Sequence, residues 1–158
     1  SVLDHGAYRR AFDARASALG ADGVTVTGAL SDEDLLGLLH AADALVFPSL
    51  VEGFGLVVLE ALACGTPVVT SGRAPFIEYL EPGDASFVDP HDPHSIAAGM
   101  MRVLEPDVAR ALAARGPAVA ARHTWAASAR VHARPYHEYS IAKESERARD
   151  AVRRALAG

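Results

Sequence analysis

Two glutamates flank a glycine loop, and these residue types at this spacing suit ligand binding. Glu52 precedes Gly53-Phe54-Gly55, and Glu60 follows Glu52 after seven intervening residues. Carboxylates accept hydrogen bonds from sugar hydroxyls, and the first N–H groups of a helix carry a partial positive charge that suits a phosphate. The glycines let a ligand approach the backbone closely. This combination predicts a site for a sugar joined to a nucleotide through a diphosphate.

The elements that must position this loop form one strand–helix–strand unit. Residues 44–47 are an apolar run stopped by a proline, which is typical of a strand buried on both faces. Apolar residues fill nearly all positions from 56 to 64, and Gly65 follows where helices commonly end. Residues 68–70 start another buried strand. Such a crossover requires parallel strands, so Glu52 lies at the carboxyl end of the first strand, where open α/β sheets bind ligands.

A purely structural role for this unit stays open on spacing alone, but three motifs extend the pattern. They are Phe-Pro-Ser at 47–49, Glu-Gly-Phe-Gly at 52–55 and Leu-Glu-Ala-Leu-Ala-Cys-Gly-Thr-Pro-Val-Val at 59–69. Together they resemble the signature of retaining glycosyltransferases of family 4, in which seven residues also separate the paired glutamates. The resemblance runs from about residue 23 to about residue 139 and includes residues 74–80 and 87–90.

The resemblance implies an α/β fold with a Rossmann-like parallel sheet flanked by helices. This is the C-terminal half of the two-domain fold known as GT-B, lacking its first two strands. Residues 1–139 would form the incomplete nucleotide-sugar-binding domain, and residues 140–158 a helical tail. The N-terminal acceptor domain would lie outside the chain. We therefore expect the 158 residues to be part of a longer enzyme and inactive alone.

The resemblance also implies roles for individual residues. Glu60 would bind the ribose hydroxyls, and Glu52 would bind the donor sugar as the catalytic carboxylate. The loop, with Gly53 and the amides of Phe54, Gly55 and Leu56, would hold the diphosphate. The reaction would transfer a hexose from the donor to an acceptor hydroxyl with retention at the anomeric carbon. It would need neither a protein nucleophile nor a bound metal, because the donor phosphate itself can accept the acceptor's proton.

Three further positions are candidates for donor contacts. Gly28 and Leu30 would lie beside the nucleotide base in the resembling family. Arg73 follows the second strand of the unit and could reach the diphosphate, although a solvated loop arginine is the alternative. His91 and His94 flank the start of a helix, but no third ligand lies near them in the sequence, so we expect no metal site.

Composition excludes several other classes of protein. The chain of 158 residues fits one domain, and its net charge of −5 gives no basic surface for a nucleic acid or an anionic membrane. No run approaches the roughly 18 apolar residues of a membrane span, and the first residues do not form a signal peptide. The single cysteine, Cys64, excludes an internal disulfide and fits the cytoplasm. The single lysine, Lys143, lies in a polar tail, and we expect no cofactor.

The other elements are read from periodicity and helix caps. We expect a helix over 3–19, a strand over 23–27 and a helix capped by Ser31. A last strand over 85–89 and helices beginning at residues 93 and 106 follow, the latter ending at Gly116. Pro135 should kink or break the closing helix.

The sequence is compatible with two other functions, and the implied strand order has one consequence for stability. A GT-B nucleotide-sugar epimerase and a non-catalytic nucleotide-sugar-binding module are the alternatives to a transferase. In the implied strand order, the strand at 44–47 would lack its neighbour and expose an apolar edge. We therefore expect self-association and marginal stability of the isolated chain.

Overall fold

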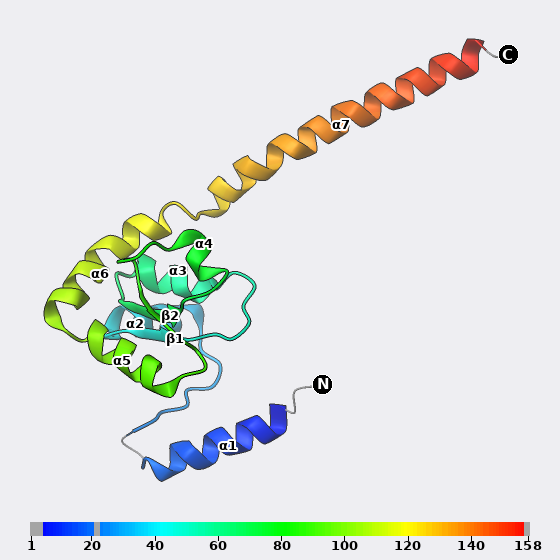
Figure 1. Ribbon diagram of the computed structural model, residues 1–158. Helices are drawn as coiled ribbons and strands as arrows, with labels where there is room; N and C mark the ends of the chain where they lie inside the picture. Colours follow the sequence, from blue (N-terminus) through cyan, green and yellow to red (C-terminus); the bar gives the residue numbers. More distant parts are fainter. Residues whose placement is uncertain (1–4, 21–22, 157–158) are drawn as a thin grey trace. The chain divides into compact units, whose positions relative to one another are not determined.

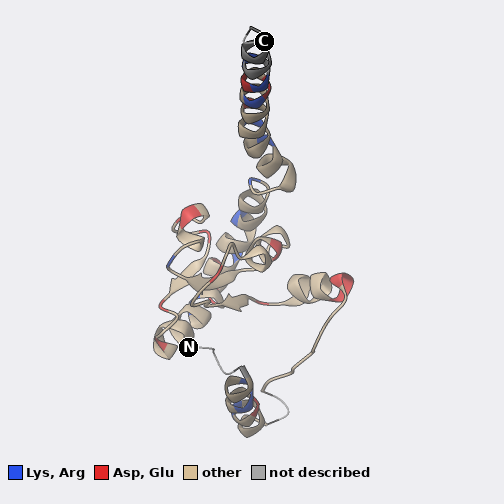
Figure 2. Ribbon diagram, turned by 90° about the vertical axis from the view of Figure 1, so that its right-hand side faces the viewer, with Lys and Arg blue, Asp and Glu red and all other residues tan. Residues whose placement is uncertain are grey.

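The computed structural model of the chain describes residues 5–20 and 23–156. They group into two units, Ser1–Leu35 and Leu36–Gly158, and helix α2 (Asp32–Ala41) spans the boundary. The first unit contains helix α1 (His5–Ala18). Ser31 begins α2 as expected, since its Oγ accepts a hydrogen bond from the Asp34 N–H at 3.1 Å. The first turn of α2 is acidic, and the last helix of the chain carries residues of both charge signs (Figure 2).

A parallel sheet of three strands lies at the centre of the second unit (Figure 1). Strand β1 (Leu45–Phe47) pairs with β2 (Val68–Ser71), and β2 pairs with β3 (Ser86–Val88). All residues of β2 are buried, whereas those of β1 are only half-buried. Central strands of parallel sheets are largely apolar because helices cover both faces. Val68 and Val69 fit this rule, whereas Thr70 and Ser71 are buried polar residues. The Thr70 hydroxyl donates a hydrogen bond to the Phe47 carbonyl oxygen at 3.0 Å.

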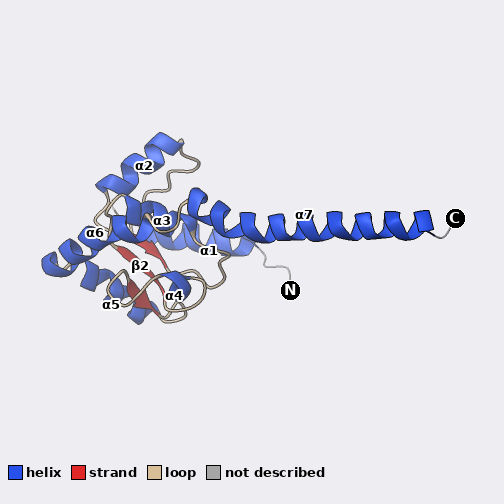
Figure 3. Ribbon diagram, turned by 90° about the horizontal axis from the view of Figure 1, so that it is seen from above, coloured by secondary structure: helices blue, strands red, loops and turns tan. Residues whose placement is uncertain are grey.

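Helices cover both faces of this sheet (Figure 3). The helices that follow β1 are α3 (Leu56–Ala63), α4 (Phe76–Tyr79), α5 (Pro93–Val103), α6 (Pro106–Ala120) and α7 (Trp125–Leu156). Helix α3 packs on β1 and β2, α5 packs on β2 and β3, and α6 contacts both of these helices. Asp92 caps α5 as expected, because its Oδ1 accepts a hydrogen bond from the His94 N–H at 2.9 Å. The parallel pairing of β1 and β2 around α3 confirms the predicted crossover.

Two apolar clusters, one on each face of the sheet, form the core. The first joins α3 to β2, α4 and α6 through residues that include Val58, Leu62, Val68, Phe76 and Val119. The second consists of Val69, Val88, Val103 and Leu112. Alternate residues of β2 thus point to opposite clusters, as the strand period of two requires. Among the described residues, no helix is both long and apolar enough to cross a membrane.

Two expectations from the sequence were wrong. Residues 23–27 form no strand, and the Val24 and Val26 side chains there are exposed, because a strand forms only against a neighbouring strand. Helix α6 continues past Gly116, which is a close contact with α3 and not a terminus: a Cβ there would lie 2.7 Å from the Leu62 carbonyl oxygen. Helix α7 runs through Pro135 without a break, and a kink at this proline stays a prediction. It also continues through residues 139 and 140, and the domain division at that point stays a prediction.

Candidate functional site

The loop Glu52–Gly55 joins the carboxyl end of β1 to the start of α3. Gly55 precedes the first residue of the helix with φ of 84° and ψ of 53°, a left-handed conformation that favours glycine. A Cβ at this position would lie 2.5 Å from Cε1 of the fully buried Phe76 ring. Backbone conformation and close packing therefore both require glycine at the point where the helix begins.

The carboxylate of Glu52 folds back on its own loop. Its Oε1 atom accepts hydrogen bonds from the N–H of Gly53 at 2.8 Å and from the N–H of Phe54 at 3.3 Å. The next N–H groups, those of Gly55 and Leu56, have no acceptor among the residues that the structure describes. Of the amides expected to hold an anion, those of Gly55 and Leu56 are thus available, whereas that of Phe54 is occupied.

An aromatic cluster from three separate elements fixes this loop. The Tyr79 hydroxyl at the end of α4 donates a hydrogen bond to the Phe54 carbonyl oxygen at 3.0 Å. The two rings stack with centroids 5.2 Å apart and an interplanar angle of 27°. His123, after α6, lies against the Tyr79 ring with centroids 5.3 Å apart. Burial, and then the charge of Glu52, raise the pKa of Tyr79 to about 12, so its hydroxyl remains a donor at neutral pH.

Sequence reasoning did not find Tyr79 or His123. They reach Phe54 from positions 79 and 123 only because α4 and the end of α6 fold against the loop. No spacing rule connects residues so far apart in the chain. The available signal was compositional: a tyrosine follows Glu78 inside the segment 74–80 that resembles the family.

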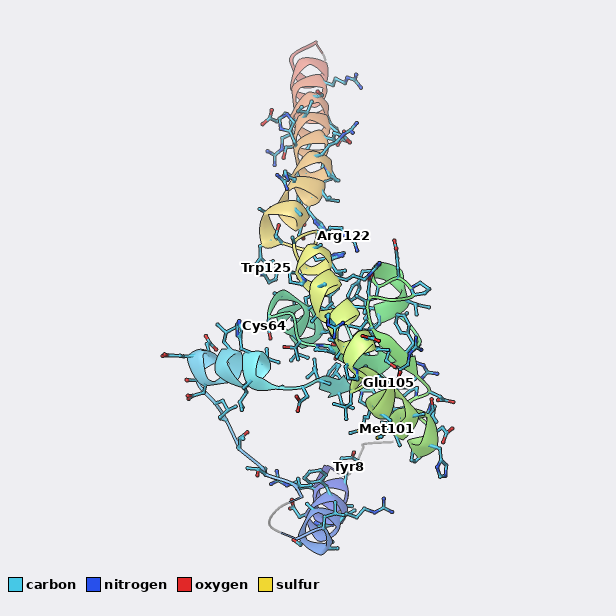
Figure 4. The ribbon with its side chains drawn as sticks, turned by 90° about the vertical axis from the view of Figure 1, so that its left-hand side faces the viewer. Tyr8, Cys64, Met101, Glu105, Arg122 and Trp125 are labelled. Atoms are coloured by element: carbon cyan, nitrogen blue, oxygen red, sulfur yellow. The ribbon has the colours of Figure 1, made fainter. Side chains whose placement is uncertain are left out.

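A cavity of about 520 Å³ opens beside the loop. Phe54 and Leu56 line one side, and Arg122, His123 and Trp125 line the other, with further residues from the first turns of α7. Figure 4 shows Arg122 at the end of α6 and Trp125 where α7 begins. The volume lies within the usual range of small-molecule sites, and its wall is mainly apolar with a few polar groups, as in such sites generally.

The remaining predicted residues lie outside this cavity. Glu60 is exposed on α3. The pKa of the Cys64 thiol is raised, mainly by the thiol's own burial and secondly by the charge of Glu60. Arg73 lines a different cavity of about 340 Å³, together with residues that include Gly72 and Asp89. The structure thus brings together Glu52, Gly53, Phe54, Gly55 and Leu56 in one segment, of which Phe54 and Leu56 line the larger cavity. Arg73 does not line that cavity.

Gly28 and Leu30 belong to the first unit. Both are exposed, and Gly28 has a left-handed φ of 70°. The structure describes them only within that unit, so their predicted contact with a nucleotide base stays a prediction. Within the described ranges, no three histidine, cysteine or carboxylate side chains gather where they could hold a metal ion.

The parallel sheet, the glycine loop at its carboxyl edge and the helix start define an α/β domain with a candidate ligand site at the ends of its strands. Residues 2–130 match the family described as "Glycosyl transferases group 1". The chain belongs to this family of transferases.

Curated relatives include two bacterial glycosyltransferases. The O-antigen chain mannosyltransferase B of Escherichia coli is 45% identical over 100 residues, which cover 62% of this chain and 26% of that protein. The D-inositol 3-phosphate glycosyltransferase of Corynebacterium jeikeium is 40% identical over 108 residues, covering 67% of this chain and 26% of that protein. The chain therefore spans about a quarter of the length of these relatives.

A solved structure shares the fold. Sucrose-phosphate synthase from Thermosynechococcus elongatus superposes with a TM-score of 0.77 and 33% sequence identity, over 86% of this chain and 35% of that one. The α/β architecture, with a parallel sheet flanked by helices, matches part of the C-terminal domain of a GT-B glycosyltransferase. This confirms the fold class that the motifs implied.

Proposed function

We propose that this domain binds the nucleotide-sugar donor of a retaining hexosyltransferase of family 4. One observation carries the proposal: the N–H groups of Gly55 and Leu56, at the start of α3, have no acceptor within the described part of the chain. They lie in the same loop as Glu52. Unpaired amides at a helix start favour a diphosphate, and the nearby carboxylate supplies acceptors for sugar hydroxyls. Membership of the family supports a nucleotide-sugar donor, and the name of the Escherichia coli relative supports a hexose.

Glu52 is the proposed sugar-binding and catalytic carboxylate. Its Oε1 atom is held by two loop amides, while Oε2 has no partner in the described part of the chain. This arrangement orients the carboxylate and leaves one oxygen for a hydroxyl of the donor sugar. Glu60 is the proposed ribose-binding residue, and as an exposed side chain on α3 it is accessible to a ligand at that helix.

In the proposed reaction, the hexose passes to an acceptor hydroxyl with retention of the anomeric configuration. The helix-start amides stabilise the negative charge that develops on the leaving diphosphate. The leaving phosphate takes the proton of the acceptor, so no protein nucleophile is required. The acceptor itself would bind to a second domain, as in a two-domain GT-B enzyme.

Calorimetry with separate carboxylate variants tests this proposal. We expect Glu60→Ala to weaken the binding of UDP, GDP or ADP, whichever the protein binds, by roughly ten- to a hundredfold, because a charged acceptor is lost. Glu52→Ala should affect mainly the corresponding nucleotide sugar. Glu78→Ala, which removes an exposed carboxylate on α4, is the matched control. Equal losses for both ligands in both site variants would contradict the assigned roles.

The reaction itself needs a separate experiment on the full-length protein. Incubation with a nucleotide sugar and an acceptor glycan, followed by product analysis, should show transfer with retained anomeric configuration. An inverted product would contradict the assignment to a retaining enzyme. Release of an epimerised sugar without transfer would contradict the transferase assignment.

A further inference from the structure

In the peptide group between Phe54 and Gly55, the carbonyl oxygen has a hydrogen-bond partner, whereas the N–H has none among the described residues. The carbonyl oxygen accepts the hydrogen bond from the Tyr79 hydroxyl at 3.0 Å. The N–H belongs to Gly55 and has no acceptor among the described residues. In a planar trans peptide, the C=O and N–H bonds point in opposite directions. A contact that holds the carbonyl oxygen toward Tyr79 therefore turns the Gly55 N–H away from it.

The side chains around this peptide restrict it further. The Tyr79 ring stacks on Phe54, and the Phe76 ring lies where a Gly55 Cβ would be. Gly55 is a buried residue, and an N–H in such a residue usually has a partner in the protein, in water or in a ligand. The same aromatic cluster thus fixes both sides of a peptide whose N–H is unpaired within the described residues.

We propose that Tyr79 is a positioning residue that orients the Gly55 N–H toward the diphosphate of the donor. The ligand in this inference rests on the function proposed above, whereas the orientation of the peptide rests on the geometry alone. Tyr79 acts through the Phe54 carbonyl and does not touch the ligand. Its hydroxyl is suited to this task because it stays protonated, and so remains a donor, well above neutral pH.

The substitution Tyr79→Phe isolates the hydroxyl, because it keeps the ring that stacks on Phe54. Tyr136→Phe makes the same chemical change at a side chain on α7 that is 71% exposed, and it serves as the matched control. We expect both variants to keep the far-ultraviolet circular dichroism of the wild type. A loss of folded signal in Tyr79→Phe alone would show that the hydroxyl supports the fold as a whole and would overturn a purely local role.

Nuclear magnetic resonance of the free protein tests the orientation without any ligand. We expect the amide resonances of Gly55 and Leu56 to shift and broaden in Tyr79→Phe, and to stay unchanged in Tyr136→Phe. Unchanged Gly55 and Leu56 resonances in Tyr79→Phe would overturn the positioning role, even if the wild type binds nucleotides.

Calorimetry then tests the ligand. We expect Tyr79→Phe to weaken the binding of a nucleoside diphosphate roughly three- to tenfold, and to leave the affinity for the corresponding nucleoside unchanged. An equal loss for both ligands, or no loss for the diphosphate, would overturn the link to the phosphates. If the wild type binds neither UDP, GDP nor ADP, the proposed function fails and the diphosphate fails as the target of the Gly55 N–H. The resonance test still decides the orientation in that case.

Discussion

The guanidinium of Arg115 donates two hydrogen bonds to the same carboxylate oxygen, Oδ1 of Asp84, at 2.9 Å from Nε and 2.7 Å from Nη2. The Asp84 side chain is only 1% exposed. Its other oxygen accepts a hydrogen bond from the Glu81 N–H at 2.9 Å and lies 3.9 Å from Nη2 of Arg122. These contacts fasten the segment after α4 to helix α6, whose end leads to His123 and the cavity.

We expect Arg115→Ala to lower the free energy of unfolding by about 2–4 kcal/mol. A buried carboxylate that loses its closest charged partner is strongly destabilised. The remaining contacts of Asp84 with the Glu81 N–H and Arg122, and water at the half-exposed position of Arg115, replace part of what is lost. Arg110→Ala is the control, since Arg110 pairs with Asp107 at the surface and should matter by less than about 1 kcal/mol. Urea titration measures both. Equal effects of the two substitutions would contradict this account.

Gly55 and Gly53 lie two positions apart in the loop but differ in what they tolerate. Gly55→Ala introduces a Cβ beside Phe76 in a left-handed conformation, and we expect it to cost about 2–5 kcal/mol. A Cβ at Gly53 meets nothing within 4 Å, and its φ lies outside the left-handed region. Gly53→Ala should therefore be nearly neutral in a thermal unfolding assay. A neutral Gly55→Ala would show that the loop can rearrange away from Phe76.

Gly116 and Gly37 form a second matched pair, both within helices. Gly116→Ala forces α6 away from the α3 backbone at Leu62, and we expect a loss of about 1–3 kcal/mol. Gly37→Ala adds a methyl group in open space within α2, and the gain in helix propensity should stabilise the protein by about 0.5–1 kcal/mol. Opposite shifts of the urea midpoint are the expected result. A stabilising Gly116→Ala would contradict the close packing of α3 on α6.

The raised pKa of Tyr79 predicts a change of stability at alkaline pH. Burial and the charge of Glu52 shift it from 10 to about 12, so the folded state holds the phenolic proton more tightly than the unfolded state. This contribution is fully present below pH 10 and is lost as the pH rises to about 12. Tyr79→Phe should lose less stability than the wild type across that interval. Urea titrations at the two ends of this pH interval measure the free energy of unfolding of each protein. An equal decrease in the wild type and in Tyr79→Phe would contradict the raised pKa.

The edge of strand β1 that pairs with no described strand leads us to expect that the isolated chain associates with other copies of itself. The strand pairs with β2 on one edge, and no described strand pairs with its other edge. Its residues Leu-Val-Phe carry no charge that would discourage pairing with another chain. We expect an apparent mass that rises with concentration in light scattering. A monomer at all concentrations, with strong amide protection in β1, would contradict this expectation.

The local pattern of the sequence was sufficient for much of the fold. Runs such as Leu-Val-Phe and Val-Val-Thr predict β1 and β2, and Gly65 correctly marks the end of α3, because these signals depend on neighbouring residues. The glycine loop and its two glutamates were likewise visible as a candidate site. The strand expected at 23–27 failed because pairing depends on a partner strand and not on alternation alone.

Tertiary structure decided what lies around the loop. Glycine is typical of helix ends, but Gly116 lies inside α6 at its contact with α3. Only the packing of the two helices reveals this role. The sequence likewise predicted a helix start beside Gly55, but only the fold brings Tyr79 to the Phe54 carbonyl and leaves the Gly55 N–H without an acceptor among the described residues. The physical reason is the distance along the sequence over which each interaction acts. Helix caps, periodicity and turns depend on residues a few positions apart. The orientation of the peptide between Phe54 and Gly55 depends on side chains that only the folded chain brings together.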